Sequence, residues 1–220
     1  MPRPGAGSRT MPVEAGAGST RHLTRADPVL GALVEAHGSL DEEQRRRGRP
    51  AGAYGALVRS IVGQQLSTKA ARTIYERLTA LFDGQTPTPA QLLAVDAERL
   101  RASGLSRAKV SYLRSLAEHV VAGELELDRL TELGDEEVIA QLTAVKGLGP
   151  WTAHMFLIFH LGRPDVLPVG DLGVRRAVQL AYGLEELPSA GALERLAAPW
   201  RPHRSLACLY LWRSLDNEPG

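Results

Sequence analysis

The chain has 220 residues, 44% apolar and 23% charged, a composition typical of a globular protein with one domain or two small lobes. With 26 Lys and Arg against 25 Asp and Glu, the net charge of +1 says little about partners, so any binding of a polyanion must come from local patches. The single cysteine, Cys208, excludes intrachain disulfides, cysteine-based zinc sites and cysteine-ligated iron–sulfur clusters.

The first twenty residues, MPRPGAGSRTMPVEAGAGST, are rich in Gly, Ala, Pro and Ser and contain no apolar stretch. We expect residues 1–20 to form a disordered tail and not a signal peptide. No apolar run reaches the roughly 18 residues needed to span a bilayer. These features favour a cytoplasmic protein without a membrane partner, associated with the nucleoid if the organism is a prokaryote.

Beyond residue 20 the apolar residues recur at helical spacing, and capping residues mark the helix starts. The predicted caps are Asp27, Ser67, Thr88, Asp96, Ser106 and Asp135. The clearest helical stretches are expected at about 28–36, 53–64, 68–82, 107–121, 136–144, 151–161, 172–182, 189–197 and 203–215.

The helical pattern predicts an all-α fold, because no stretch shows sustained alternation of apolar and polar residues. The connections are short, and we expect the first and last helices to pack together. Residues 21–220 are therefore predicted to form a two-lobed helical body with an interlobe cleft.

The stretch VKGLGPWTAHMFLIF, residues 145–159, places two glycines between two predicted helices. It predicts a helix–hairpin–helix at about 140–155. Such a turn can present the amides of Gly147, Gly149 and the first helical turn around Thr152 to a phosphate oxygen. Backbone contacts of this kind would position DNA without reading its sequence. Judged from the glycines alone, an ordinary corner between two helices is the alternative.

In VLPVGDLGVRRAV, Asp171 stands immediately before a predicted helix. An ordinary N-cap is one reading. The apolar residues Val166, Leu167 and Val169 before it favour a carboxylate near a hydrophobic wall. A partly desolvated carboxylate facing a DNA-binding turn could stabilise the oxocarbenium-like sugar formed when a base leaves. It could also orient or deprotonate the attacking water.

Four sequence motifs, taken together with their order along the chain, resemble those of the helix–hairpin–helix DNA glycosylase superfamily. GLGPWTA, VGDLGVRRA, SIVGQQLSTKAA (60–71) and GLSRAKVSYLRSLA (104–117) are similar to its alkylated-base branch, the 3-methyladenine DNA glycosylase II type. The similarity runs from about Asp27 to Asp216. It implies a monofunctional, monomeric enzyme of base excision repair. Such an enzyme flips purines like 3-methyladenine or 7-methylguanine out of double-stranded DNA and hydrolyses the N-glycosidic bond.

The resemblance also assigns residues. Asp171 takes the catalytic position, and Trp151, Trp212 and Met155 fall in the base pocket, with core packing as the alternative for Trp212. Trp151 stands where strand-cutting branches carry a lysine that forms a Schiff base, so no lyase activity is expected. Its electron-rich ring would attract a cationic methylated purine. Gln65, with Leu66 as runner-up, matches the wedge that fills the gap left by the flipped base, although both residues could simply end a helix.

Family members bind a metal ion through hairpin carbonyls, which here would be those of Thr143, Val145 and Gly147. A monovalent cation is therefore possible at the hairpin, and no cofactor is required for the reaction. Lys109 is a candidate phosphate contact, with a solvated surface position as the alternative. A non-catalytic helix–hairpin–helix module that binds DNA or its damage is the alternative function. Mismatch and adenine glycosylases usually carry a four-cysteine cluster, which one cysteine cannot supply.

Overall fold

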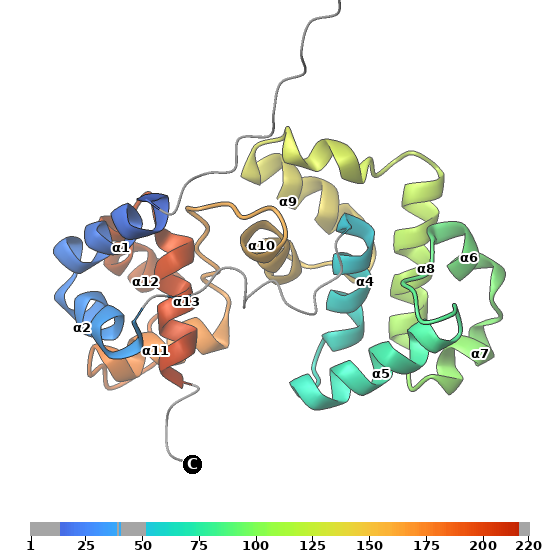
Figure 1. Ribbon diagram of the computed structural model, residues 1–220, viewed down its shortest axis with the longest axis horizontal. Coiled ribbons are helices and arrows are strands. Elements are labelled where there is room, and N and C mark those ends of the chain that lie inside the picture. The colour runs from blue at the N-terminus through green and yellow to red at the C-terminus, as the bar shows by residue number, and fades with distance from the viewer. Residues whose placement is uncertain (1–13, 39, 41–51, 216–220) are drawn as a thin grey trace, which may run out of the picture. The chain divides into compact units, whose positions relative to one another are not determined.

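In the computed structural model, residues 14–38, 40 and 52–215 are described, and within these ranges every regular element is helical. The all-α prediction is therefore confirmed. The chain divides into two compact units (Figure 1). Unit 1 combines Met1–Leu40 with Val169–Gly220, and unit 2 is Asp41–Pro168. No helix of the described ranges is long and apolar enough to cross a membrane.

Unit 1 joins the first helices of the chain to the last ones, as the sequence predicts. Its helices are α1 (Glu14–Ala26), α2 (Pro28–His37), α11 (Leu172–Ala181), α12 (Ala190–Leu196), the 3-10 helix η2 (Ala198–Trp200) and α13 (Arg204–Leu215). Helix α13 packs against α11, α2 and α1. The fully buried side chains at these contacts include Leu23, Leu30, Val174, Val178, Trp200, Ala207, Cys208 and Leu211.

A buried carboxylate ties both ends of unit 1 together. Asp27 is 8% exposed, and its Oδ1 accepts from the amides of Val29 and Leu30 as the N-cap of α2. Its Oδ2 accepts from the Tyr182 hydroxyl and, at 2.8 Å, from Trp200 Nε1. Burial and this contact raise the pKa of Tyr182 well above its usual range, so its hydroxyl stays a donor. Asp27, predicted as a helix cap, therefore also accepts hydrogen bonds from residues far away in the sequence.

Unit 2 holds the middle of the chain. Its helices are α4 (Ala53–Gly63), α5 (Thr68–Ala80), α6 (Pro89–Ala94), α7 (Ala97–Ala102), α8 (Arg107–Val121), the 3-10 helix η1 (Leu127–Thr131), α9 (Asp135–Ala144) and α10 (Pro150–Phe159). Helix α4 packs against α5, α8 and α10, while α8 also covers α6 and α7. The buried apolar stripes of these helices include Leu57, Ile61, Leu78, Leu92, Leu100, Leu113, Leu116, Leu142 and Leu157.

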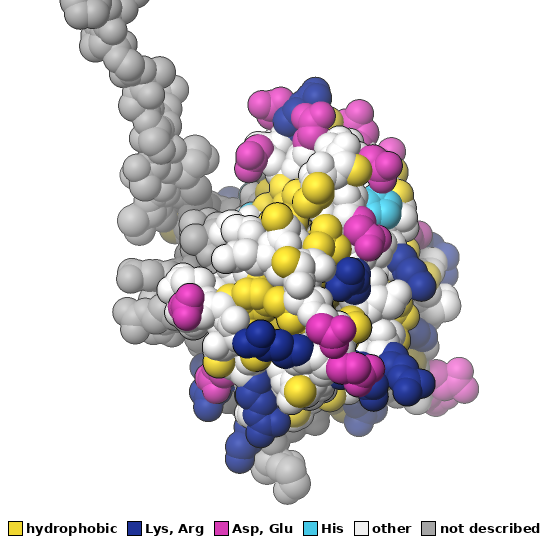
Figure 2. Space-filling view, turned by 90° about the vertical axis from the view of Figure 1, so that its right-hand side faces the viewer, with side chains coloured by type: hydrophobic (Ala, Val, Ile, Leu, Met, Phe, Trp, Pro, Cys, Tyr) yellow, Lys and Arg dark blue, Asp and Glu magenta, His cyan; other side chains and the backbone are white. Residues whose placement is uncertain are grey.

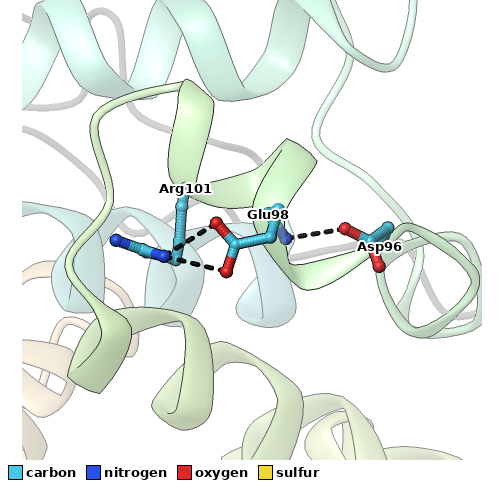
Figure 3. A network of polar contacts seen from close by, with 3 residues as sticks. All are labelled: Asp96, Glu98 and Arg101. Carbon is cyan, nitrogen blue, oxygen red and sulfur yellow. Dashed lines mark hydrogen bonds and ion pairs between the residues drawn. The ribbon is translucent and has the colours of Figure 1, made fainter.

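The helix starts of unit 2 follow the predicted capping chemistry. Ser67, Thr88 and Ser106 each accept a hydrogen bond from an amide three residues later. Asp96 accepts from the amide of Glu98 at 2.8 Å, and Glu98 in turn binds Arg101 through both carboxylate oxygens (Figure 3). These bonds satisfy amides that have no partner within their own helix.

Two boundaries differ from the sequence prediction. Residues 14–20, assigned to the disordered tail, belong to helix α1, whereas residues 1–13 lie outside the described residues. Helix α1 packs against α2, η2 and α13, and this tertiary packing stabilises a segment that composition alone assigns to a tail. Asp135 is the first residue of α9, and its predicted capping position is taken by Gly134.

The surface of unit 2 mixes charges of both signs. Figure 2 shows one face on which Asp and Glu side chains predominate in the upper part, most Lys and Arg side chains lie in the lower part, and apolar side chains lie between them. This agrees with the near-zero net charge of the chain. Any phosphate binding therefore depends on particular local groups.

Candidate functional site

The predicted hairpin is present in unit 2. Helix α9 ends at Ala144, α10 begins at Pro150, and residues 145–149, the hairpin turn, connect them. The Leu148 amide donates to the Val145 carbonyl at 3.1 Å. Gly147 has a φ of 89°, in the left-handed region that favours glycine, whereas Gly149, with a φ of −94°, is the N-cap of α10. Positive φ is therefore needed at only one of the two glycines.

Gly147 is also required by a close neighbour. A Cβ atom at this position would lie 2.1 Å from Cγ of Tyr112, a residue of α8. The aromatic ring thus packs directly against the backbone of the hairpin turn, and only a residue without a side chain fits there.

We expect Gly147→Ala to lower the free energy of unfolding by about 2–5 kcal/mol, because it combines a left-handed backbone with a clash against the Tyr112 ring. Gly149→Ala is the matched control, since a Cβ there meets no atom within 4 Å. It should cost less than about 1 kcal/mol. Urea unfolding of both variants measures the difference, and equal losses would show that the Tyr112 contact does not restrict this position.

The N-terminus of α10 combines exposed and buried groups. Pro150 occupies its first position, where a missing N–H does no harm, and the following amides have no acceptor within the helix. The Thr152 side chain is buried, and its Oγ1 lies 3.5 Å from Nε2 of Gln64. Among the predicted phosphate-binding residues, Gly147, Gly149 and Thr152, the last could therefore offer its backbone amide but not an exposed hydroxyl.

The turn between α4 and α5 presents both wedge candidates at the surface. Gln65 and Leu66 are exposed, and the Leu66 amide donates to the Gly63 carbonyl. Gln65 has a φ of 58°, and Asp83 is the only other non-glycine residue with a positive φ among the described residues. A left-handed, exposed glutamine is a strained conformation that the surrounding structure must maintain.

Two of the predicted pocket residues lie on α10. Trp151 is 44% exposed and Met155 is half-buried. Being four residues apart, they share one face of the helix. Trp151 is thus not a core residue, and its base-pocket role stays a prediction.

Asp171 lies in unit 1 and caps helix α11, so the N-cap reading is correct. Its Oδ1 accepts from the Val174 amide at 2.7 Å and from Trp212 Nε1 at 2.9 Å. The residue is 8% exposed. These two donors fix the rotamer of the carboxylate.

Trp212 is brought to Asp171 by the packing of α13 against α11. A Cβ at Gly173 would lie about 3.0 Å from Asp171 Oδ1 and 3.1 Å from Trp212 Nε1, so a glycine makes room for this pair. Cys208 is fully buried nearby, and burial together with the negative charge of Asp171 raises the pKa of its thiol. The Trp212 indole thus donates to the candidate catalytic carboxylate, and both its predicted pocket role and the alternative of core packing stay open.

The structure also identifies residues that sequence reasoning missed or misread. Gln64 donates to the Gly147 carbonyl at 2.9 Å, which ties the α4–α5 turn to the hairpin turn. Lys109, considered a phosphate contact, donates to the carbonyls of Val62 and Gln64. The only sequence signal was their position in the motifs GQQLS and SRAKV. Neither motif names a partner, because the partners lie 45 to 83 positions away.

Comparison with known proteins decides the family. A family model described as "HhH-GPD superfamily base excision DNA repair protein" matches residues 58–202. The chain belongs to this superfamily. The HhH-GPD match includes the α4–α5 turn, the hairpin and Asp171, and it ends before Trp212. The resemblance found in the sequence is therefore confirmed.

Relatives of this HhH-GPD protein carry consistent names. It is 37% identical over 195 residues to DNA-3-methyladenine glycosylase 1 of Schizosaccharomyces pombe, covering 88% of this chain and 85% of that protein. The structure of S. pombe 3-methyladenine DNA glycosylase in complex with abasic DNA matches with a TM-score of 0.81 at 33% identity, covering 90% of this chain and 97% of that one. A DNA-3-methyladenine glycosidase from Bacillus halodurans matches with a TM-score of 0.78 at 38% identity, covering 90% and 89%.

Proposed function

We propose that this protein is a monofunctional DNA glycosylase that removes alkylated purines, of the 3-methyladenine or 7-methylguanine type, in base excision repair. The observation that carries the proposal is the carboxylate of Asp171, held by the Val174 amide and the Trp212 indole in a chain of this family. The names of its relatives support the same reaction.

In the proposed reaction, Asp171 stabilises positive charge on the sugar. As the bond to the base lengthens, the deoxyribose becomes oxocarbenium-like, and a fixed carboxylate lowers the energy of that state. The same group orients or deprotonates the water that attacks the sugar carbon. A pre-oriented carboxylate does this without reorganising during the reaction, which is the role of the Trp212 hydrogen bond.

The proposed substrate preference follows from Trp151. Purines methylated at N3 or N7 carry a positive charge and leave readily, and the face of an exposed indole attracts a cation by about 0.5–2 kcal/mol. Met155 lies on the same face of α10 and is proposed to contribute to the same base-binding surface. The base-pocket role of Trp212 stays a prediction from the family resemblance. Trp151 has no amine, so no Schiff base can form at this position and strand cleavage is not expected.

DNA contacts are proposed for the two turns of unit 2. The hairpin turn would bind phosphate through the amides of Gly147 and Gly149, and Gln65, with Leu66 beside it, would enter the base stack after flipping. The proposed partner is double-stranded DNA with an alkylated base, bound by a monomer.

A monovalent cation at the hairpin is part of this proposal. It would be held by the carbonyls of Thr143, Val145 and Gly147. The Val145 carbonyl already accepts from Leu148 N and the Gly147 carbonyl from Gln64 Nε2, and each keeps one lone pair for a cation. Such an ion would add positive charge next to a bound phosphate.

The proposal is tested with a set of duplexes, each carrying one modified base: 3-methyladenine, 7-methylguanine, ethenoadenine, hypoxanthine or 1-methyladenine. We expect release of 3-methyladenine or 7-methylguanine with formation of an abasic site, and none from undamaged DNA. Borohydride should trap no covalent adduct with DNA. A trapped adduct would contradict the monofunctional assignment.

The alternative function is a non-catalytic module that binds DNA. In such a module, Asp171 would serve only as the N-cap of α11. A module that only binds DNA would show salt-sensitive binding to duplexes and release no base from any of these substrates.

A further inference from the structure

The turn that carries Gln65 is held by a lysine from another helix. We call residues 64–66 the wedge turn. Lys109, on α8, donates from Nζ to the carbonyl of Val62 at 2.8 Å and to that of Gln64 at 2.7 Å. Carbonyls in the last turn of a helix have no partner within it, and a lysine can satisfy them. Lys109 is half-buried, and this burial lowers the pKa of its ammonium group.

The wedge turn is also connected to the hairpin turn. The Gln64 side chain donates to the Gly147 carbonyl at 2.9 Å. Tyr112 lies on the side toward which a Cβ of Gly147 would point. It follows Lys109 on α8 by three residues. Residues three apart share a helix face, so one face of α8 supports both turns. These contacts lie entirely within unit 2.

The backbone of the wedge turn needs such support. Gln65 is exposed and left-handed at a φ of 58°, a conformation that persists only where neighbouring contacts impose it. The Lys109 ammonium group and the hydrogen bond from the Leu66 amide to the Gly63 carbonyl hold the backbone around it. Loss of the two hydrogen bonds from the Lys109 ammonium group would allow the wedge turn to leave this conformation.

We propose that Lys109 is a positioning residue that holds the wedge turn so that Gln65 can enter the DNA base stack, and that Gln64 fixes this turn relative to the hairpin. The inference rests on the proposed function and adds how the wedge is kept in place. Lys109 then acts through Gln65 and not as a phosphate ligand.

The first test is Lys109→Met. Base release from a duplex with one 7-methylguanine, measured in a single turnover, should slow by about 10–100-fold, because small misplacements of a positioning group have effects of this size. Affinity for undamaged duplex should keep the wild-type salt dependence. A phosphate contact would instead lower the slope of log affinity against log salt by about one. Arg99→Met, which removes an exposed cation from unit 2, is the matched charge control and should keep the wild-type rate.

The decisive test is a double-mutant cycle with Gln65→Ala. Binding is measured to a duplex that contains a tetrahydrofuran abasic analogue, with 2-aminopurine next to it to report insertion into the stack. If Lys109 acts through Gln65, each single variant weakens binding and reduces the fluorescence change, and the double variant is no worse than Gln65→Ala. Lys109→Arg, which keeps donors and charge, should restore most of the loss.

The outcomes separate the inference from the proposed function. Additive effects in the cycle, or a reduced salt slope for Lys109→Met, would overturn the positioning role even if the wild type releases methylated bases. If the wild type binds the abasic analogue and the cycle is non-additive, but no base is released, the glycosylase proposal fails and the positioning role stands.

Thermal unfolding of each variant confirms that folded protein is compared. If Lys109→Met does not fold, the cycle is run with Lys109→Gln, which removes the ammonium group but keeps a polar side chain, and a loss that adds to that of Gln65→Ala overturns the inference.

Discussion

Asp171→Asn should slow release of 3-methyladenine or 7-methylguanine by about 10²–10³-fold or more while the protein stays folded. The substitution removes the negative charge that would stabilise the sugar, and loss of one such electrostatic contact typically has this effect. It keeps Oδ1, so the hydrogen bonds from the Val174 amide and Trp212 Nε1 can still form. Asn also caps helices about as well as Asp, and the free energy of unfolding should change by less than about 1 kcal/mol.

The matched control for this variant is Asp96→Asn. Asp96 caps α7 through the Glu98 amide, as Asp171 caps α11, but it is exposed and has no proposed role in the reaction. Base release is measured in a single turnover with enzyme in excess, so that product release does not mask the chemical step. If Asp171→Asn releases the base at nearly the wild-type rate, Asp171 serves only as the N-cap of α11 and not in the reaction.

The second large effect is expected for stability. Asp27→Ala should lower the free energy of unfolding by about 3–5 kcal/mol, because it removes the acceptor of four donors. Trp200 Nε1 is fully buried and would lose its acceptor, and the cap of α2 would be lost as well. Tyr182 would also lose the acceptor of its hydroxyl.

Asp96→Ala provides the comparison, since it removes an exposed aspartate cap with one hydrogen bond. It should cost about 1 kcal/mol. Urea denaturation followed by tryptophan fluorescence and by circular dichroism measures both variants. If Asp27→Ala costs no more than Asp96→Ala, the contacts to Tyr182 and Trp200 contribute nothing to the stability of unit 1.

Features that depend on local chemistry were predictable from the amino-acid sequence. A capping side chain bonds to an amide two or three residues away, and this is why Asp27, Ser67, Thr88, Asp96 and Ser106 were correctly predicted as caps. The all-α class followed from the period of the apolar residues, and the hairpin followed from glycines between two helices. The order of four motifs was enough to indicate the family, which the comparisons confirmed.

The prediction was wrong where a segment is stabilised by contacts with distant parts of the chain. Helix α1 begins at Glu14 although its composition indicated a tail, because its stability comes from packing against α2, η2 and α13. For Asp171, the cap and the hydrophobic surroundings were both foreseen as alternatives. The structure shows that the residue is both a cap and a mostly buried group.

Contacts between residues far apart in the chain could not be predicted and are known from the folded structure alone. Trp212 donates to Asp171 across 41 positions, Lys109 reaches Val62 across 47, and Trp200 reaches Asp27 across 173. A sequence gives the kind of side chain at each position, whereas a partner depends on how helices pack, which is set by the sum of many weak apolar contacts. For this reason the candidate catalytic residue could be read from a motif, and the groups that hold it and the wedge turn in place could not.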